Sequence, residues 1–517
     1  MILIFPLVIL FATCLVLIII KIFHQNFRFS WIIASLGAFF SVISIILWQI
    51  KMPFSISLPT WKPETIFHVT PSWVVDGYSW VYAICLATLT FSVIFTAVIR
   101  KNSRSINWAA ILFVTAIGLL AVTSQNLTSV VIAWIGLDLV ELIFWLYTNN
   151  ATRSEEIVIS FVSRLVGVLL ISWSSILSYI PGSLVNLGTI PETAGILIIS
   201  AIIFRLGIIP FHLPRKGEES NHGVMTVFRL ISAGSALAII SRIPIASLPT
   251  NFQSYLLLIG ELLSITGSLL WLFSPDGFSG LTYWIFSLSG LALSSTVIGN
   301  PVGSISCAIT MILGGGLIFM YSHRNRKNLW LPILGLIGIS TIPFSATASV
   351  WSNSISTNLI ILIPQVISLS IIGAGYIKHA LLPDETSSKN SEPDWITTTY
   401  KIGLFSLVFV LILLGLWGWQ GARIINTWWI SGVVIILSLL IYLTVRRQTE
   451  KLDRFQISAS QFHSNLISNS FWMVYRAIRQ VVQLITTILE GDAGILWSIV
   501  VMVLIITLFL QMAPGTQ

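Results

Sequence analysis

The chain has 517 residues, of which 56% are hydrophobic and only 9% are charged, and its mean hydropathy is +0.92. This composition excludes a soluble globular protein and predicts an all-α polytopic membrane protein with about 14–16 transmembrane helices. The formal net charge is +8. Cys14, Cys85 and Cys307 are scattered through apolar segments without CxxC spacing, which indicates packing residues and excludes a disulfide framework.

Apolar runs long enough to cross a bilayer recur along the chain. Residues 1–20 lack a basic n-region and a small-residue cleavage site, which favours a retained first helix over a removed signal peptide. In chain order, we predict spans near residues 2–20, 31–50, 78–99, 107–124, 127–148, 156–179, 194–210, 223–241, 253–273, 279–298, 303–321, 329–350, 358–377, 401–419, 427–445 and 493–511.

The loops between these spans differ in their content of Lys and Arg. If the N-terminus lies outside, the inner loops hold 17 basic residues and the outer loops hold 4. Because Lys and Arg collect on the cytoplasmic side, both termini are predicted on the outer side of the cell (inner) membrane. Topology accounts for the positive charge, so the basic balance predicts a protein in the lipid bilayer and no nucleic-acid partner.

The helix order also predicts an internal repeat. Spans four to eight and nine to thirteen each contain five helices, and this odd number makes the second block inverted relative to the first. Pro210 interrupts helix seven and Pro343 interrupts helix twelve, which is the pattern of an ion site between inverted repeats. Alternatively, these helices simply tolerate proline, as at Pro364.

Five segments follow from this division. They are 1–106, N-terminal transmembrane helices; 107–248, the first five-helix repeat; 249–380, the second inverted five-helix repeat; 381–445, additional transmembrane helices; and 446–517, an amphipathic interfacial helix with a final transmembrane anchor.

Ionisable residues inside the predicted spans are rare and therefore mark candidate sites. Two interpretations stay open: half of an ion path with the three acids as titratable members, or a buried charge network that neutralises itself and positions helices. His212 and His222 lie at a membrane boundary beside a charged loop. The candidate ion-path or network residues are Asp138, Glu141, Arg164, Arg205, Arg229 and Glu261.

Four motifs carry a family resemblance, and the most specific is a buried cation followed five residues later by ProPheHis. The motifs are TPSWVVDGYS at 70–79, WIGLDLVE at 134–141, RLGIIPFH at 205–212 and DGFSGLTYWIFSLSG at 276–290. In this order they resemble the antiporter-like membrane subunits of respiratory complex I (NADH:quinone oxidoreductase), of Mrp-type cation/proton antiporters and of membrane-bound hydrogenases. The resemblance covers about residues 70–380.

The chain departs from the family pattern at its charged positions. Where the family has a glutamate in span five, this chain has Asp138, with Glu141 one turn later on the same helix face. Where the family has a lysine in span seven, this chain has Arg205. The lysine of the 276–290 motif is replaced by Phe278. Arginine stays protonated in proteins, so Arg205 is a poor proton carrier where the family has lysine.

Two further positions differ. The span-eight lysine or histidine falls near Phe228 or Gly234, where the nearest ionisable residue is Arg229. The charged residue that follows the span-twelve break falls near Trp351 and Ser352. The resemblance therefore implies a member with a degenerate ion path.

The resemblance implies proton translocation as part of a complex I-type or related energy-converting complex, with other membrane subunits as partners and protons or monovalent cations as the ions. Alternatives are a non-pumping scaffold subunit and an ion- or bicarbonate-coupled transporter component of the same fold. The sequence contains no nucleotide-binding loop, iron–sulfur cysteine set or haem motif, so it predicts no cofactor and no metal. Any redox chemistry belongs to partner subunits.

The C-terminal segment suggests a further contact. Residues 471–489 mix apolar side chains with Arg476, Arg479 and Gln483, which indicates an interfacial amphipathic helix that leads into the last span. It resembles a shortened form of the lateral helix of the largest antiporter-like subunits. A plain surface helix that anchors the last span explains the pattern equally well.

The charge asymmetry of the loops makes the topology testable. Cysteine labelling or reporter fusions should place residues 215–219 and 446–454 inside and residues 181–193 outside, because basic loops stay in the cytoplasm. Labelling of the 215–219 loop from the outside would contradict this orientation.

Overall fold

The fold was analysed in a computed structural model. It describes residues 3–24, 29–59, 70–99, 105–148, 154–178, 186–208, 222–321, 328–351, 359–382, 393–418, 428–447 and 480. The chain divides into two compact units, Met1–Leu452 and Asp453–Gln517, and everything below concerns the first. The predicted helix at 471–489 and the last predicted span lie outside the described residues, apart from residue 480.

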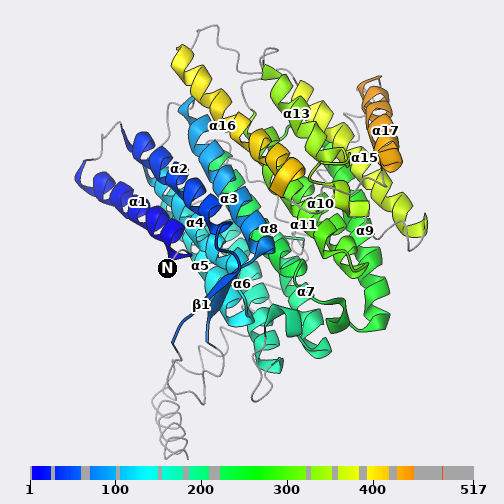
Figure 1. The fold of residues 1–517 in the computed structure, drawn as a ribbon, viewed down its shortest axis with the longest axis horizontal. Helices are drawn as coiled ribbons and strands as arrows, with labels where there is room; N and C mark the ends of the chain where they lie inside the picture. Colours follow the sequence, from blue (N-terminus) through cyan, green and yellow to red (C-terminus); the bar gives the residue numbers. More distant parts are fainter. Residues whose placement is uncertain are drawn as a thin grey trace, which may run out of the picture. The chain divides into compact units, whose positions relative to one another are not determined.

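Helices dominate the described residues, and twelve of them are long and apolar enough to cross a membrane (Figure 1). This confirms the prediction of an all-α polytopic membrane protein. In chain order the helices are α1 (Ile4–Phe23), α2 (Ser30–Trp48), α3 (Gly77–Thr96), α4 (Ser105–Thr123), α5 (Leu127–Thr148), α6 (Ser154–Leu177), α7 (Glu192–Leu206), α8 (His222–Ile240), α9 (Thr250–Phe273), α10 (Leu281–Val297), α11 (Pro301–Ile309), α12 (Gly315–Met320), α13 (Trp330–Ile339), α15 (Leu359–Leu381), α16 (Asp394–Leu413) and α17 (Trp428–Arg447).

Short 3-10 and π segments join some of these helices. A π-helical stretch at Thr310–Gly314 connects α11 and α12 into one apolar span, and the indole of Trp284 donates a hydrogen bond to the Met311 carbonyl inside it, at 3.1 Å. The relation between the two predicted five-helix repeats stays a prediction.

Helix seven ends earlier than its apolar pattern indicates. α7 stops at Leu206 because Gly207 adopts a left-handed conformation, with a φ of 71°, which ends a helix without a Cβ penalty. Pro210 and His212 lie outside the described residues.

Helix twelve is interrupted, as the proline at 343 predicts. α13 ends at Ile339, and the chain continues through Thr341 and Phe344, which have positive φ angles of 57° and 67°, to a 3-10 turn at Ala348–Trp351. Thr347 Oγ1 donates to the Gly338 carbonyl at 2.9 Å and accepts from the Thr341 amide at 3.0 Å. These bonds satisfy backbone groups that a break inside a membrane would otherwise leave exposed.

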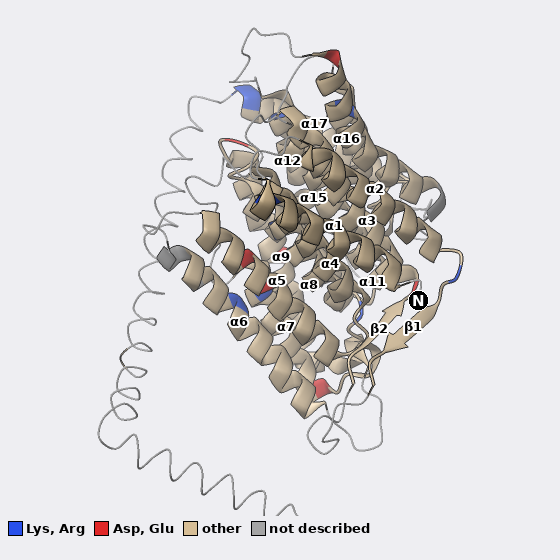
Figure 2. Cartoon of the chain, turned by 90° about the vertical axis from the view of Figure 1, so that its left-hand side faces the viewer, with Lys and Arg blue, Asp and Glu red and all other residues tan. Residues whose placement is uncertain are grey.

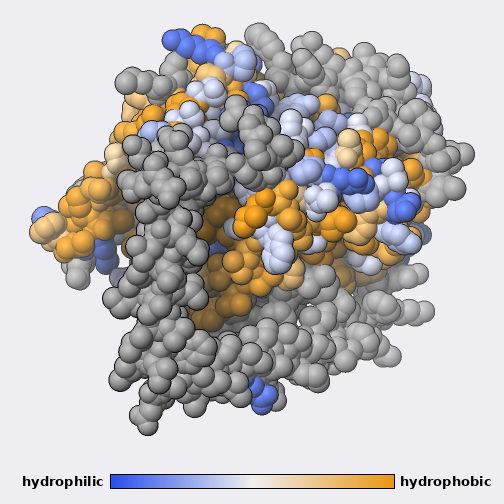
Figure 3. Space-filling view, turned by 90° about the horizontal axis from the view of Figure 1, so that it is seen from below, coloured by the Kyte–Doolittle hydropathy of each residue, from blue (hydrophilic) through white to orange (hydrophobic). Residues whose placement is uncertain are grey.

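The helices differ in how far they are buried. Most residues of α8 and α10 are enclosed by neighbouring helices, whereas α1, α6 and α17 expose large apolar side chains such as Phe23, Leu169 and Ile436. On the described part of the face that Figure 3 shows, apolar side chains form orange patches with polar residues between them. Such surfaces suit contact with lipid tails, which are as apolar as leucine.

A short β-hairpin was not predicted from the sequence. β1 (Phe54–Ser57) pairs antiparallel with β2 (Ser72–Val75), and Phe54 lies opposite Val75. Four-residue strands give too short an alternation to stand out beside membrane helices. β2 leads directly into α3 through Asp76, whose carboxylate caps that helix.

The contact between α9 and α10 depends on glycine. A Cβ on Gly290 would lie 2.5 Å from the Gly260 carbonyl oxygen and 2.6 Å from the Ser264 amide, both of which are backbone atoms that cannot move aside cheaply. We expect Gly290→Ala to lower the stability by about 1–3 kcal/mol through overpacking. The measurement is the thermal unfolding of the detergent-purified protein.

Gly432→Ala is the matched control, since a Cβ there meets no atom within 4 Å. Equal melting temperatures for the two variants would contradict the close approach of α9 and α10.

Candidate functional site

Three consecutive helices bring four charged side chains together. α5 supplies Asp138 and Glu141, which lie one turn apart, α6 supplies Arg164, and α7 supplies Arg205. All four residues are buried. In Figure 2 acidic and basic residues accordingly gather where α5, α6 and α7 meet. We call these four residues the charge cluster.

Arg205 forms the most enclosed contact of the cluster. Its Nη1 donates to both carboxylate oxygens of Asp138, at 2.6 Å and 2.7 Å, and its side chain is fully buried. The guanidinium carbon lies 5.0 Å from the ring centroid of Trp134, one helical turn before Asp138. An aromatic face stabilises a desolvated cation. The Nε and Nη2 atoms of Arg205 have no hydrogen-bond partner among the described residues.

Arg164 contacts both acids. Its Nη2 donates to Glu141 Oε1 at 2.8 Å, its Nη1 donates to Glu141 Oε2, and Nη1 lies 3.6 Å from Asp138 Oδ1. The Oγ and carbonyl oxygen of Ser160, one turn earlier on α6, accept further bonds at 3.1 Å and 3.3 Å. The two hydrogen bonds from Arg164 to the two oxygens of Glu141 form a bidentate pair, the geometry in which guanidinium and carboxylate groups bind most strongly.

The formal charge of the cluster is zero, since two carboxylates oppose two guanidinium groups. An unpaired buried charge costs several kcal/mol, so α6 and α7 each depend on the acids of α5, and α5 depends on both arginines. The charge cluster can hold helices in place and set a local field. Arginine stays protonated, so Arg164 and Arg205 cannot pass protons on.

Arg229 and His222 lie on α8. Arg229 is partly buried and follows Phe228, whose ring packs edge-on against Phe144 of α5 with centroids 5.3 Å apart. His222 begins α8, and its ring stacks on Phe278 at 4.0 Å. Phe278 is the position at which the family pattern has lysine.

Glu261 lies on α9, apart from the charge cluster. Gln365 of α15 donates its amide to Glu261 Oε1 at 3.1 Å, while Oε2 has no hydrogen-bond partner among the described residues. No arginine or lysine of the described residues forms an ion pair with Glu261. Its surroundings therefore differ in kind from those of Asp138 and Glu141.

Some contacting residues were not singled out from the sequence. Trp134 and Ser160 precede Asp138 and Arg164 by four residues, so helical spacing could have indicated them. Gln365 could not be found in this way, because it is 104 residues from Glu261. The same holds for Lys378 of α15, which donates to the Leu272 and Ser274 carbonyls at the end of α9, at 2.9 Å each.

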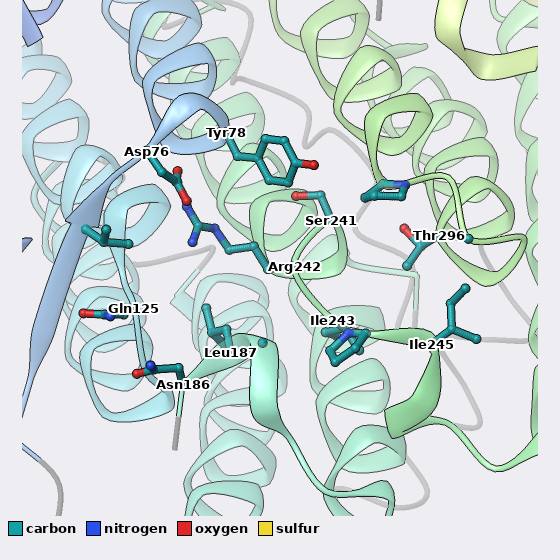
Figure 4. A pocket seen from close by; sticks show the side chains of 15 residues that line it. Asp76, Tyr78, Gln125, Asn186, Leu187, Ser241, Arg242, Ile243, Ile245 and Thr296 are labelled. Carbon is teal, nitrogen blue, oxygen red and sulfur yellow. The ribbon is translucent and has the colours of Figure 1, made fainter. Parts of the chain in front are cut away.

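A pocket of about 540 Å³ lies where several helices begin or end (Figure 4). Arg242, just after α8, directs its Nη2 at Asp76 Oδ1 at 2.8 Å. This pair was not predicted from the sequence, because its two residues are 166 positions apart in the chain. The pocket is lined by Val74, Asp76, Tyr78, Gln125, Asn186, Leu187, Gly188, Ser241, Arg242, Ile243, Pro244, Ile245, Thr296, Gly299 and Pro301.

Comparison with known proteins identifies the fold. No protein-family model and no curated protein match the sequence. Among solved structures, the chain is similar to one in the Mrp complex from Dietzia sp. DQ12-45-1b, with a TM-score of 0.74 and 13% identity over 99% of this chain. It spans 63% of the length of that Mrp chain.

Two respiratory complexes contain similar chains. A chain of the membrane-bound sulfane sulfur reductase, an archaeal respiratory membrane complex, matches with a TM-score of 0.70 and 14% identity over 97% of this chain and 100% of that one. A chain of respiratory complex I from Thermus thermophilus with bound aureothin matches with a TM-score of 0.57 and 16% identity. That match covers 80% of this chain and 98% of the complex I chain. The protein is thus a multi-pass membrane protein that shares its fold with these chains of the Mrp complex and of two respiratory complexes. The resemblance carried by the four motifs is confirmed at the level of the fold.

The charge cluster makes a prediction about stability. Arg205→Ala should lower the stability by about 3–5 kcal/mol, because it leaves Asp138 buried beside one remaining cation. The double variant Asp138→Asn, Arg205→Ala should recover part of this loss, since the remaining Arg164–Glu141 pair is neutral. Thermal unfolding in detergent measures both effects.

Arg447→Ala, at an exposed position in the last turn of α17, serves as the control. If Arg205→Ala melts like this control, the ion pair does not stabilise the helices.

Proposed function

We propose that the chain is an antiporter-like membrane subunit of a multi-subunit energy-converting complex, and that its charge cluster is a fixed structural network with no proton relay. Each carboxylate of α5 is in contact with a guanidinium group, Asp138 with Arg205 and Glu141 with Arg164. This observation carries the proposal. A relay needs neighbouring groups that gain and lose a proton, whereas the charged neighbour of each acid here is an arginine, which retains its proton.

The second half of the chain supports the same proposal. Within the described parts of α11, α12 and α13 there is no Asp, Glu, Lys or Arg. Hydroxyl and amide groups occupy the interior instead: Ser306 contacts Ser349, and Asn300 Nδ2 donates to the Ser349 carbonyl at 2.7 Å. Such groups can hold water but cannot store a proton. The described parts of these three helices therefore offer a proton path no carboxylate, ammonium or guanidinium group.

The fold supports a place among other membrane subunits. The similar chains belong to an Mrp complex, to a respiratory sulfane sulfur reductase and to respiratory complex I. In the proposed arrangement the protein crosses the cell membrane with both termini outside, and residues 107–248 and 249–380 form two inverted five-helix repeats. Partner subunits contact its lipid-exposed helices and supply any redox chemistry.

A second candidate function is favoured by one observation. Glu261 is a buried carboxyl without a basic partner among the described residues, and its Oε2 has no hydrogen-bond partner there. A buried carboxyl in this setting either carries a proton or binds a cation. In this second proposal the subunit exchanges protons or monovalent cations at Glu261, and the charge cluster only supports the helices.

Two variants separate these proposals. Asp138→Asn with Arg205→Gln keeps the charge cluster neutral, and Glu261→Gln removes the isolated acid. If the charge cluster is a fixed structural network, both variants should assemble and retain the wild-type proton flux of the complex in proteoliposomes. Flux is measured with a pH-sensitive dye against turnover.

A lower proton yield in Glu261→Gln, with assembly intact, would favour exchange at Glu261. A lower yield in the double variant would contradict the fixed network.

A further inference from the structure

The pocket beside Asp76 and Arg242 belongs to neither the charge cluster nor Glu261. It lies where α3 begins, α8 ends, and the turn between α10 and α11 passes. A volume of about 540 Å³ is within the range of pockets that hold small molecules. No part of the proposed function uses this pocket.

Asp76 has a structural role at the start of α3. Its Oδ1 accepts from the Ser79 amide at 2.8 Å and from Ser79 Oγ at 2.9 Å, so that it caps the N-terminus of α3. The same oxygen accepts the bond from Arg242. The capping bonds fix Asp76 in position, so its carboxylate occupies one donor of Arg242 and competes with any other anion for that guanidinium group.

Arg242 has unused binding capacity. Its bond to Asp76 occupies Nη2, and the described residues offer the guanidinium no second partner. The side chain is 13% exposed, so its other N–H groups border the pocket (Figure 4). A guanidinium group has five donors in a fixed fork that matches oxyanions such as carboxylate and phosphate.

The rest of the lining fits such a ligand. Tyr78, Gln125 and Asn186 offer neutral polar groups, and the backbone dipoles of α3 and α11 place partial positive charge at the helix starts beside the pocket. Leu187, Ile243 and Ile245 supply an apolar wall. We propose that this pocket binds an oxyanion, a phosphate or carboxylate group, on the free donors of Arg242.

The oxyanion has two possible sources, a free solute and the head group of a phospholipid. Both present the same chemistry to Arg242, and the pocket lies where α3 and α11 begin and α8 ends. The apolar wall can accept the carbon skeleton beside a lipid phosphate. The experiment therefore measures the binding of added inorganic phosphate and the retention of copurified phospholipid separately.

The test compares three variants of the full chain in detergent. Arg242→Gln removes the proposed anchor. Asp76→Asn keeps a side chain that can cap α3 but removes the carboxylate that competes for Arg242. Arg446→Gln removes an exposed charge on α17 and is the matched control. Thermal unfolding is followed against phosphate, with chloride at equal ionic strength, and native mass spectrometry counts bound phospholipid.

The two pocket variants should change binding in opposite directions. Arg242→Gln should weaken phosphate binding or phospholipid retention about tenfold or more, because a charge-assisted hydrogen bond is lost. Asp76→Asn should strengthen it severalfold, and Arg446→Gln should match the wild type. Stabilisation by added phosphate identifies a solute site, and selective loss of phospholipid identifies a head-group site.

If Arg242→Gln does not fold, Arg242→Lys keeps the charge without the fork and should show a partial loss. The proposal is overturned if neither phosphate nor phospholipid distinguishes the wild type from the Arg242 variant that folds. It is equally overturned if Arg446→Gln loses as much binding, since the effect then reflects net charge.

Discussion

The contact between Arg205 and Asp138 is the interaction on which the first half of the protein depends. A single guanidinium or carboxylate among apolar helices would be strongly destabilising, but Arg205 of α7 donates to both oxygens of Asp138, and Arg164 of α6 lies 3.6 Å from the same acid while it holds Glu141. A shift of α5, α6 or α7 by one turn would leave a charge without its partner. The cluster therefore fixes the relative positions of three helices.

The two halves of the chain solve the problem of buried polarity differently. The first half pairs full charges, whereas the second interrupts a helix after Ile339 and satisfies the freed backbone with hydroxyl groups such as Thr347 and, from α17, Ser431, which donates to the Thr341 carbonyl at 2.6 Å. Neither solution provides a chain of titratable groups. Glu261 belongs to neither arrangement: it accepts a hydrogen bond from Gln365 and has no basic partner among the described residues.

Two arginine–aspartate pairs in this protein have different physical roles. In the Arg205–Asp138 pair the side chains are 0% and 2% exposed, whereas in the Arg242–Asp76 pair they are 13% and 35% exposed. An enclosed pair mainly prevents the cost of an isolated charge, and a partly exposed pair contributes less to stability because solvent screens it. The Arg242–Asp76 pair is only partly enclosed, and the proposed oxyanion site depends on water or a ligand reaching the donors that Asp76 leaves unused.

The sequence by itself determined the membrane class, nearly all the helices and the buried charges, because hydrophobic runs of membrane length and rare ionisable residues within them are local properties. It also placed Asp138 and Glu141 on one helix face, since helical spacing is local. The partners were decided only by tertiary structure: Arg205 is 67 residues from Asp138, Gln365 is 104 from Glu261 and Arg242 is 166 from Asp76. Hydropathy gives the length of each helix but not which faces of distant helices meet, and those contacts depend on close packing such as that of Gly260 against Gly290.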